Sequence, residues 1–245
     1  MSDWLFDLGN SRLKCAPLER DGTVGEVLAI AHDGRAFALD WSDRLPARID
    51  AAYVASVAAP ALRVALLEAL SARCGRIGLA STQRAWDGLH IAYAQPARLG
   101  VDRFLALLAA RARGGAWLVA GVGTALTVDL VDAGGRHHGG RIAPSPALMR
   151  EALQARAAQL PAQGGEYREF AADTDDALAS GCIGAALGLL QRSQAEAAQA
   201  CAGPVPLLLH GGGADALLPH LPEATHAPAL VLEGLARWAL PDATA

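Results

Sequence analysis

The stretch Trp4-Leu5-Phe6-Asp7-Leu8-Gly9-Asn10-Ser11 is an apolar run that ends in a polar turn, and the chain returns through residues 12–17. This pattern predicts a β-hairpin with its polar atoms at the tip. A segment with the same plan, residues 117–129, lies in the second half of the chain. Each copy has a glycine and a hydroxyl residue at its turn, Gly9 with Ser11 and Gly123 with Thr124. The repeat predicts two tandem α/β halves.

Strands and helices are expected to alternate along the rest of the chain. Residues 53–57 and 205–209 are typical of short buried strands. The predicted helices cover residues 60–74, 102–113, 146–160, 174–200, 214–218 and about 226–240. This alternation indicates α/β architecture, and the hairpins indicate sheets that are not wholly parallel. Because no low-complexity linker separates the halves, we predict domains at residues 1–114 and 115–245 with a narrow, hinged cleft between them.

The composition is that of a well-buried globular protein, with 52% hydrophobic and 19% charged residues. A formal net charge of -4 and scattered arginines argue against nucleic acid as a ligand. Residues 1–4 lack the features of a secretory signal, and the longest apolar window, residues 177–190, is too short to span a bilayer. The four cysteines lack the spacing of metal ligands and predict reduced thiols. We therefore expect a cytoplasmic protein that binds no membrane.

The first hairpin carries the groups that a nucleoside triphosphate requires. Gly9 permits close backbone approach, and Asn10 and Ser11 can donate hydrogen bonds from the turn. Lys14, the single lysine beside 20 arginines, can meet a phosphate as a point charge. Asp7 can hold Mg²⁺ directly or through water. The alternative is an ordinary polar turn, in which asparagine and glycine are common.

The second hairpin favours the phosphate-binding interpretation. Gly123-Thr124-Ala125-Leu126-Thr127 again offers a glycine and hydroxyls at a turn, and two such tips facing one another would hold the phosphates from both sides. Residues 211–213 are three glycines that lead from a strand into a helix, where an adenosine or an anion could bind. The triglycine alone could also be only a tight turn.

Four blocks of sequence together resemble the type III pantothenate kinases over nearly the whole chain. They are Asp7-Leu8-Gly9-Asn10-Ser11-Arg12-Leu13-Lys14, Tyr93 with Gly100-Val101-Asp102-Arg103, Gly123 to Thr127, and Gly139-Gly140-Arg141-Ile142. The resemblance implies two tandem ribonuclease-H-like domains of the actin-like ATPase fold, with the active site in the interdomain cleft. It also implies a homodimer that uses ATP with Mg²⁺ to phosphorylate pantothenate to 4′-phosphopantothenate, the first step of coenzyme A biosynthesis.

The resemblance assigns roles to individual residues. Asp102 resembles the general base that accepts the proton of the pantothenate hydroxyl. Residues 7–14 and Thr124 resemble the ATP-binding positions, with Asp7 on the metal. The substrate-binding positions are Tyr93, Gly100, Val101, Asp102, Arg103 and, reaching pantothenate in the partner subunit, Thr174. The structural alternatives are a helix N-cap for Asp102, a surface ion pair for Arg103 and a helix cap for Thr174.

Three positions depart from the family pattern. The family often has an aspartate that helps to bind a monovalent cation, K⁺ or NH₄⁺, where this chain has Gly121. Ser145 replaces a glycine, and His210 replaces a threonine before the late glycines, so we expect looser adenosine binding. These departures favour one rival, an accessory protein of the same fold without enzymatic activity. A second rival is a kinase of the same fold with another small acceptor.

Overall fold

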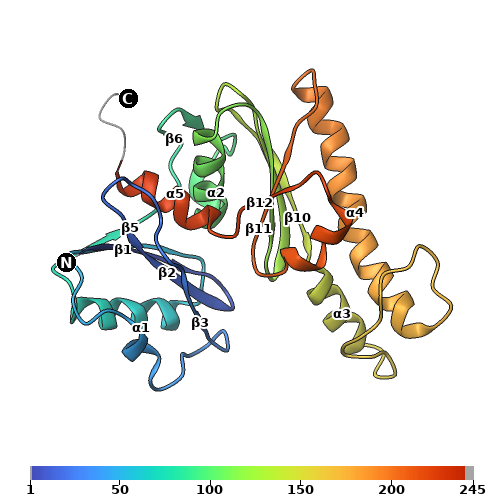
Figure 1. Cartoon of the computed structure of the whole chain (residues 1–245), viewed down its shortest axis with the longest axis horizontal. Helices are drawn as coiled ribbons and strands as arrows, with labels where there is room; N and C mark the ends of the chain where they lie inside the picture. Colours follow the sequence, from blue (N-terminus) through green and yellow to red (C-terminus); the bar gives the residue numbers. More distant parts are fainter. Residues whose placement is uncertain (1, 241–245) are drawn as a thin grey trace. The chain divides into compact units, whose positions relative to one another are not determined.

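The computed structural model describes residues 2–240, which divide into two compact units (Figure 1). The first unit contains residues 2–114, 135–137 and 229–240, and the second contains residues 115–134 and 138–228. The sequence predicts one boundary near residue 114, but the last helix lies with the first unit. The predicted outer ends of the domains, residue 1 and residues 241–245, are outside the described residues.

The first unit is built on a five-stranded sheet in the order β3-β2-β1-β4-β5. The strands are β1 (Asp3–Leu8), β2 (Arg12–Leu18), β3 (Leu28–Ala31), β4 (Ala51–Ser56) and β5 (Arg76–Leu79). The first three are antiparallel neighbours, whereas β4 pairs parallel to β1 and β5 parallel to β4. A small ribbon of β6 (Ala85–Trp86) and β7 (Leu89–His90) follows. The predicted hairpin therefore forms the centre of a mixed sheet.

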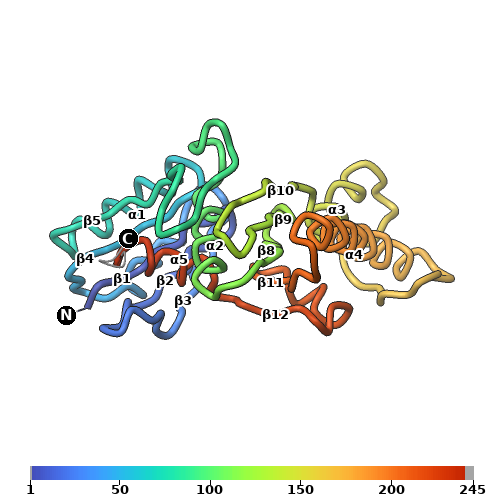
Figure 2. The backbone as a smooth tube through the Cα atoms, turned by 90° about the horizontal axis from the view of Figure 1, so that it is seen from above, coloured from blue at the N-terminus to red at the C-terminus, as the bar shows by residue number. Residues whose placement is uncertain are grey.

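Three helices cover the two faces of this sheet (Figure 1). Helix α1 (Pro60–Ser71) packs Leu62, Leu66 and Leu70 into a core with Phe6 and Leu8 of β1. Helices α2 (Val101–Ala112) and α5 (Leu230–Ala239) lie side by side in Figures 1 and 2, and α5 also contacts β1. Because side chains alternate along a strand, Asp7, which lies between Phe6 and Leu8, faces away from the α1 core.

The second unit repeats the plan of the first, with the strand order β10-β9-β8-β11-β12. Its strands are β8 (Trp117–Val122), β9 (Ala125–Val131), β10 (His137–Pro144), β11 (Leu207–His210) and β12 (Thr225–His226). Strands β8 and β9 form the second predicted hairpin, and β11 pairs parallel to β8. Helices α3 (Pro146–Gln154) and α4 (Thr174–Ala200) pack against each other. The α/β repeat predicted from the two hairpins is confirmed.

Some predicted helix boundaries are wrong. The helix expected at residues 214–218 is two short 3-10 turns, Ala214–Ala216 and Leu218–His220, and Pro219 lies within the second of them. The last helix begins at Leu230 because residues 225–226 form β12. Helix α3 ends at Gln154, six residues before its predicted end.

Within residues 2–240, no helix combines the length and the apolar character needed to cross a bilayer. The apolar window at residues 177–190 lies inside α4, where its buried side chains include Leu178, Cys182 and Leu190. The prediction of a packed helix is therefore confirmed. All four cysteines are free thiols, as their spacing predicts.

Candidate active site

The first hairpin places Asp7 directly across from Lys14. The two residues pair in the antiparallel register of β1 and β2, so their side chains lie on the same face of the sheet. That face is opposite to the one on which Leu8 packs. The turn is closed by a hydrogen bond of 3.0 Å from Gly9 N to Arg12 O. An acid and an amine thus stand together beside a tight turn.

The residues of the ATP-binding block differ in what they can offer a ligand. Asn10, Ser11 and Arg12 are exposed at the turn. Leu8 and Leu13 are fully buried in the core of the first unit. These two leucines anchor the hairpin and have no side-chain surface to offer a nucleotide.

Helix α2 brings Asp102 to the same part of the first unit. The helix begins at Val101, and Gly100 occupies the N-cap position without a side-chain cap. Asp102 lies in the first turn, so the alternative in which it caps the helix is wrong. A Cβ atom added to Gly100 would lie only 2.5 Å from Asp102 Oδ1. The glycine therefore leaves room for this carboxylate at the start of the helix.

The pKa of Asp7 shows that Asp7, Asp102 and Lys14 interact. This pKa is raised to about 7, mainly by burial and then by the charge of Asp102, while Lys14 opposes the rise. A nearby cation stabilises the ionised forms of two carboxylates that repel each other in a buried, poorly solvated site. A bound divalent ion would therefore reduce the repulsion between these two carboxylates.

The donor set fits a Mg²⁺ ion that arrives with a nucleotide. Magnesium is usually held by one or two carboxylates, with phosphate oxygens and water completing its coordination. Across the part of the chain that the structure describes, no group of three or more histidine, cysteine, aspartate or glutamate side chains could hold a metal. Asp7 could therefore be one ligand of a Mg²⁺ ion whose other ligands are phosphate oxygens and water. It could not belong to a site in which the described part of the protein supplies every ligand.

Arg103 follows Asp102 on α2 and points into the protein. Its exposed fraction is only 7%, so the alternative of a surface ion pair is wrong. The guanidinium Nη1 donates to the Tyr93 hydroxyl at 3.3 Å, and its carbon lies 5.9 Å from the centre of that ring. The His137 ring stacks on Tyr93 with a centroid distance of 5.9 Å. Tyr93 therefore holds the arginine in a defined orientation near the start of α2, where Val101 is buried.

The second unit supplies its own turn. Thr124 is exposed between β8 and β9, where Gly123 N donates to Ala125 O at 2.9 Å. The triglycine packs against the same hairpin, because Gly213 N donates to Val122 O at 2.9 Å. Gly211 has φ +96, and a Cβ atom there would lie 2.4 Å from Val122 O. Glycine at this position is required by both conformation and space.

Ser145 also has a structural explanation. It is the N-cap of α3, where its hydroxyl accepts a hydrogen bond of 3.2 Å from Leu148 N, and it is almost fully buried. Its backbone N–H donates to Thr124 O at 3.4 Å. The serine that replaces the family glycine therefore links α3 to the second turn.

Gly121 and His210 are neighbours across β8 and β11. A Cβ atom added to Gly121 would lie 2.9 Å from His210 Nε2 and 2.9 Å from Thr127 Oγ1. An aspartate at this position would collide with the imidazole, so the two departures from the family pattern depend on each other. Hard cations prefer oxygen ligands to imidazole nitrogen. These residues do not fit the monovalent cation that the resemblance implies.

Thr174 is exposed at the first position of α4 in the second unit. The cap of this helix is Asp173, whose carboxylate accepts from Asp176 N at 2.9 Å. The alternative of Thr174 as a helix cap is therefore wrong. The predicted residues before Gly114 all belong to the first unit, whereas Thr124 and Thr174 belong to the second.

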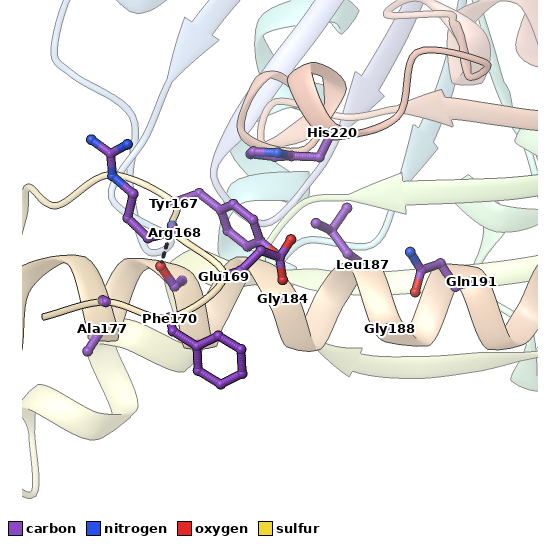
Figure 3. A pocket seen from close by; sticks show the side chains of 13 residues that line it. Tyr167, Arg168, Glu169, Phe170, Ala177, Gly184, Leu187, Gly188, Gln191 and His220 are labelled. Carbon is purple, nitrogen blue, oxygen red and sulfur yellow. Dashed lines mark hydrogen bonds between the residues drawn. The ribbon is translucent and has the colours of Figure 1, made fainter.

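A pocket of about 700 Å³ lies along α4 (Figure 3). Its wall includes Tyr167 and His220, whose ring centroids are 4.5 Å apart. Arg168 N donates to Ser180 Oγ at 2.7 Å at one end, which is the dashed line in Figure 3. The glycines of α4 in the wall are Gly181, Gly184 and Gly188. None of the residues that the sequence assigns to ATP or substrate lines this pocket.

The family model of type III pantothenate kinase matches residues 4–196. The chain belongs to this family. A type III pantothenate kinase of Stenotrophomonas maltophilia is 58% identical to it over 241 residues, covering 98% of both chains. One from Xanthomonas axonopodis pv. citri is 57% identical over 240 residues, again covering 98% of both.

Solved structures share the fold of this type III pantothenate kinase at low sequence identity. A Campylobacter jejuni protein described as a Baf family transcriptional activator has a TM-score of 0.65 at 19% identity, covering 98% of this chain and 99% of that one. A 2-dehydro-3-deoxygalactonokinase protein from Sinorhizobium meliloti has a TM-score of 0.56 at 16% identity, covering 97% and 99%. These likenesses support the two-domain actin-like ATPase fold.

Sequence reasoning missed His137, the ring that stacks on Tyr93 in this type III pantothenate kinase. The histidine is fully buried at the start of β10, far along the chain from Tyr93. It belongs to none of the blocks that carry the resemblance. No local pattern could have linked the two rings.

Proposed function

We propose that this kinase transfers the γ-phosphoryl group of ATP to the primary hydroxyl of pantothenate, giving 4′-phosphopantothenate for coenzyme A biosynthesis. Membership of the family supports the reaction. The observation that carries the mechanism is the interaction of Asp7, Lys14 and Asp102 around one turn of the first unit. Phosphoryl transfer asks the protein mainly for positioning and charge stabilisation, which this group of side chains can supply.

In the proposed reaction, Asp102 accepts the proton of the pantothenate hydroxyl. The hydroxyl oxygen forms a bond to the γ-phosphorus while the bond from that phosphorus to the bridging oxygen of ADP breaks. Lys14, the turn at residues 9–11 and Thr124 donate to the phosphates. Asp7 would hold Mg²⁺, which neutralises phosphate charge when bound. A monovalent cation has no assigned role, because Gly121 and His210 leave no carboxylate for it.

The substrate is proposed to bind beside the start of α2. Arg103, held by Tyr93, suits the carboxylate of pantothenate, because a guanidinium presents a planar fork to two oxygens. Gly100 and Val101 contribute backbone atoms. In the homodimer that the resemblance implies, Thr174 reaches the pantothenate of the other copy. We further propose that the enzyme works in the cytoplasm and binds neither nucleic acid nor membrane.

A coupled assay of ADP release, with and without pantothenate, tests the proposal. We expect pantothenate-dependent turnover, and we expect Asp102→Asn to lower kcat by about 10²–10⁴, the range of general-base catalysis. ATP should still raise the unfolding temperature of this variant. Asp175→Asn is the matched control, because Asp175 is an exposed aspartate in the first turn of α4. Turnover only with another hydroxy acid, or full activity in Asp102→Asn, would contradict the assignment.

A further inference from the structure

His32 lies directly behind the turn of the first hairpin. It follows β3, whose last residue, Ala31, pairs with Arg12 of β2. The backbone N–H of His32 donates to Ser11 O at 3.3 Å. Its ring Nε2 lies 3.0 Å from Gly9 O. The histidine thus contacts the backbone on both sides of Asn10.

The two ring nitrogens of His32 have fixed and opposite roles. Gly34 N lies 3.1 Å from Nδ1, and a backbone N–H can only donate, so Nδ1 is an acceptor. Gly9 O can only accept, so Nε2 must carry the proton. The hydrogen bonds therefore select a neutral imidazole with its proton on Nε2.

Aromatic packing fixes the plane of this imidazole. The Phe37 ring meets it edge to face with a centroid distance of 5.3 Å, and His32 and Phe37 form an antiparallel bridge. Phe37 in turn stacks on Trp41 at 4.0 Å. Asp33 closes the intervening loop by accepting from Arg35 N and Ala36 N. The ring is held from both its polar and its apolar sides.

Fixing the Gly9 carbonyl also fixes the amide of the next residue. In a planar trans peptide, the C=O of Gly9 and the N–H of Asn10 point in opposite directions. Because the carbonyl is directed at His32, the Asn10 N–H is directed away from it. A backbone N–H held in this way can meet a phosphate without the entropic cost of ordering a loose turn.

We propose that His32 is a positioning residue for the ATP phosphates, which it serves by locking the Gly9–Asn10 peptide of the first turn. The inference rests on the proposed role of this turn in binding ATP. His32 itself does not touch the nucleotide. Its contribution is to fix the direction of the Asn10 N–H donor. We therefore expect substitutions of His32 to change the affinity for ATP and not the rate of the chemical step.

Three substitutions separate the two hydrogen bonds of the ring. The amide nitrogen of His32→Gln can replace the Nε2 donor to Gly9 O, whereas the amide oxygen of His32→Asn can replace only the Nδ1 acceptor. His32→Leu retains neither. We expect the Leu and Asn variants to raise KM for ATP by roughly three- to tenfold. The Gln variant should stay near the parent value, and kcat and KM for pantothenate should change little in all three.

Phe37→Leu is the intermediate case, because it removes the ring that orients His32 and leaves both hydrogen-bonding nitrogens in the chain. It should weaken ATP binding less than His32→Leu does, since the imidazole loses only its apolar support. Titrating a non-hydrolysable ATP analogue against each variant measures the effect even if pantothenate proves not to be the acceptor, so the two proposals can fail separately. Parent-like analogue affinity in His32→Leu, or equal losses in the Gln, Leu and Phe37→Leu variants, would overturn the role of His32.

Discussion

The two hairpins occupy the same place in the same sheet plan, yet they present different chemistry. Two residues before the turn glycine, the first hairpin has Asp7 and the second has Gly121. Across the ladder, Asp7 faces Lys14 whereas Gly121 faces Thr127. The two units thus repeat the same strand arrangement, but the charged pair at the first hairpin has no counterpart at the matching positions of the second.

Burying like charges close together is energetically unfavourable. This cost is a reason for the acids and the lysine to be confined to the first hairpin and the helix beside it. The raised pKa of Asp7 shows that its ionised form is disfavoured in the absence of a cation, mainly because of burial and secondarily because of Asp102. In the second unit, Gly121 stands at the position of the acid, and His210 Nε2 lies 2.9 Å from where a Cβ atom of residue 121 would be. We infer that the first turn serves the metal and the phosphates with charged side chains, and that the second serves the phosphates with an uncharged hydroxyl.

The largest expected effect tests this division directly. Asp7→Asn should lower kcat/KM for ATP by at least about a hundredfold, because metal-assisted charge stabilisation is worth several kcal/mol. Thr124→Ala should lower it by only about tenfold, the effect of one hydrogen bond to a charged group. Steady-state kinetics with varied ATP and Mg²⁺ measure both. The control is Asp3→Asn on the same strand, and equal losses at Asp7 and Thr124 would end the comparison.

An intermediate effect concerns the monovalent cation. We expect the parent enzyme to be equally active in potassium, ammonium and choline chloride, because Gly121 and His210 leave no carboxylate for such an ion. The double variant Gly121→Asp/His210→Thr should become more active in potassium than in choline. Gly121→Asp alone should unfold at a lower temperature, since its side chain meets the imidazole. Strong activation of the parent by potassium would show that another site binds the ion.

The smallest effect is on stability, and its sign follows from the pKa of Asp7. A carboxyl whose folded pKa is raised to about 7 destabilises the fold once the pH rises above its unfolded value of 3.8. Asp7→Asn should therefore have a higher unfolding temperature than the parent at pH 8, and the difference should narrow at pH 5. Thermal unfolding without nucleotide or divalent metal measures it. A constant difference across this range would mean that Asp7 does not titrate in the fold.

Much of the fold could be predicted because strands and turns leave local signals. The apolar runs that end in glycine turns identified both hairpins, and the acids beside Thr174 identified the start of α4. Boundaries that depend on distant partners could not be predicted. The last helix begins late because residues 225–226 pair with β11, a contact that no local window contains.

The amino-acid sequence alone shows which groups are available: one lysine, an acid at the first turn, and an acid and an arginine at the start of α2. It also carries the blocks that resemble the type III pantothenate kinases. The tertiary structure decided which of them interact. It placed Asp102 near Asp7, buried Arg103 against Tyr93, set His32 behind Gly9 and filled the space at Gly121 with His210. Charge coupling, hydrogen bonding and exclusion of volume depend on distances between residues that are remote along the chain, and only the folded backbone sets those distances.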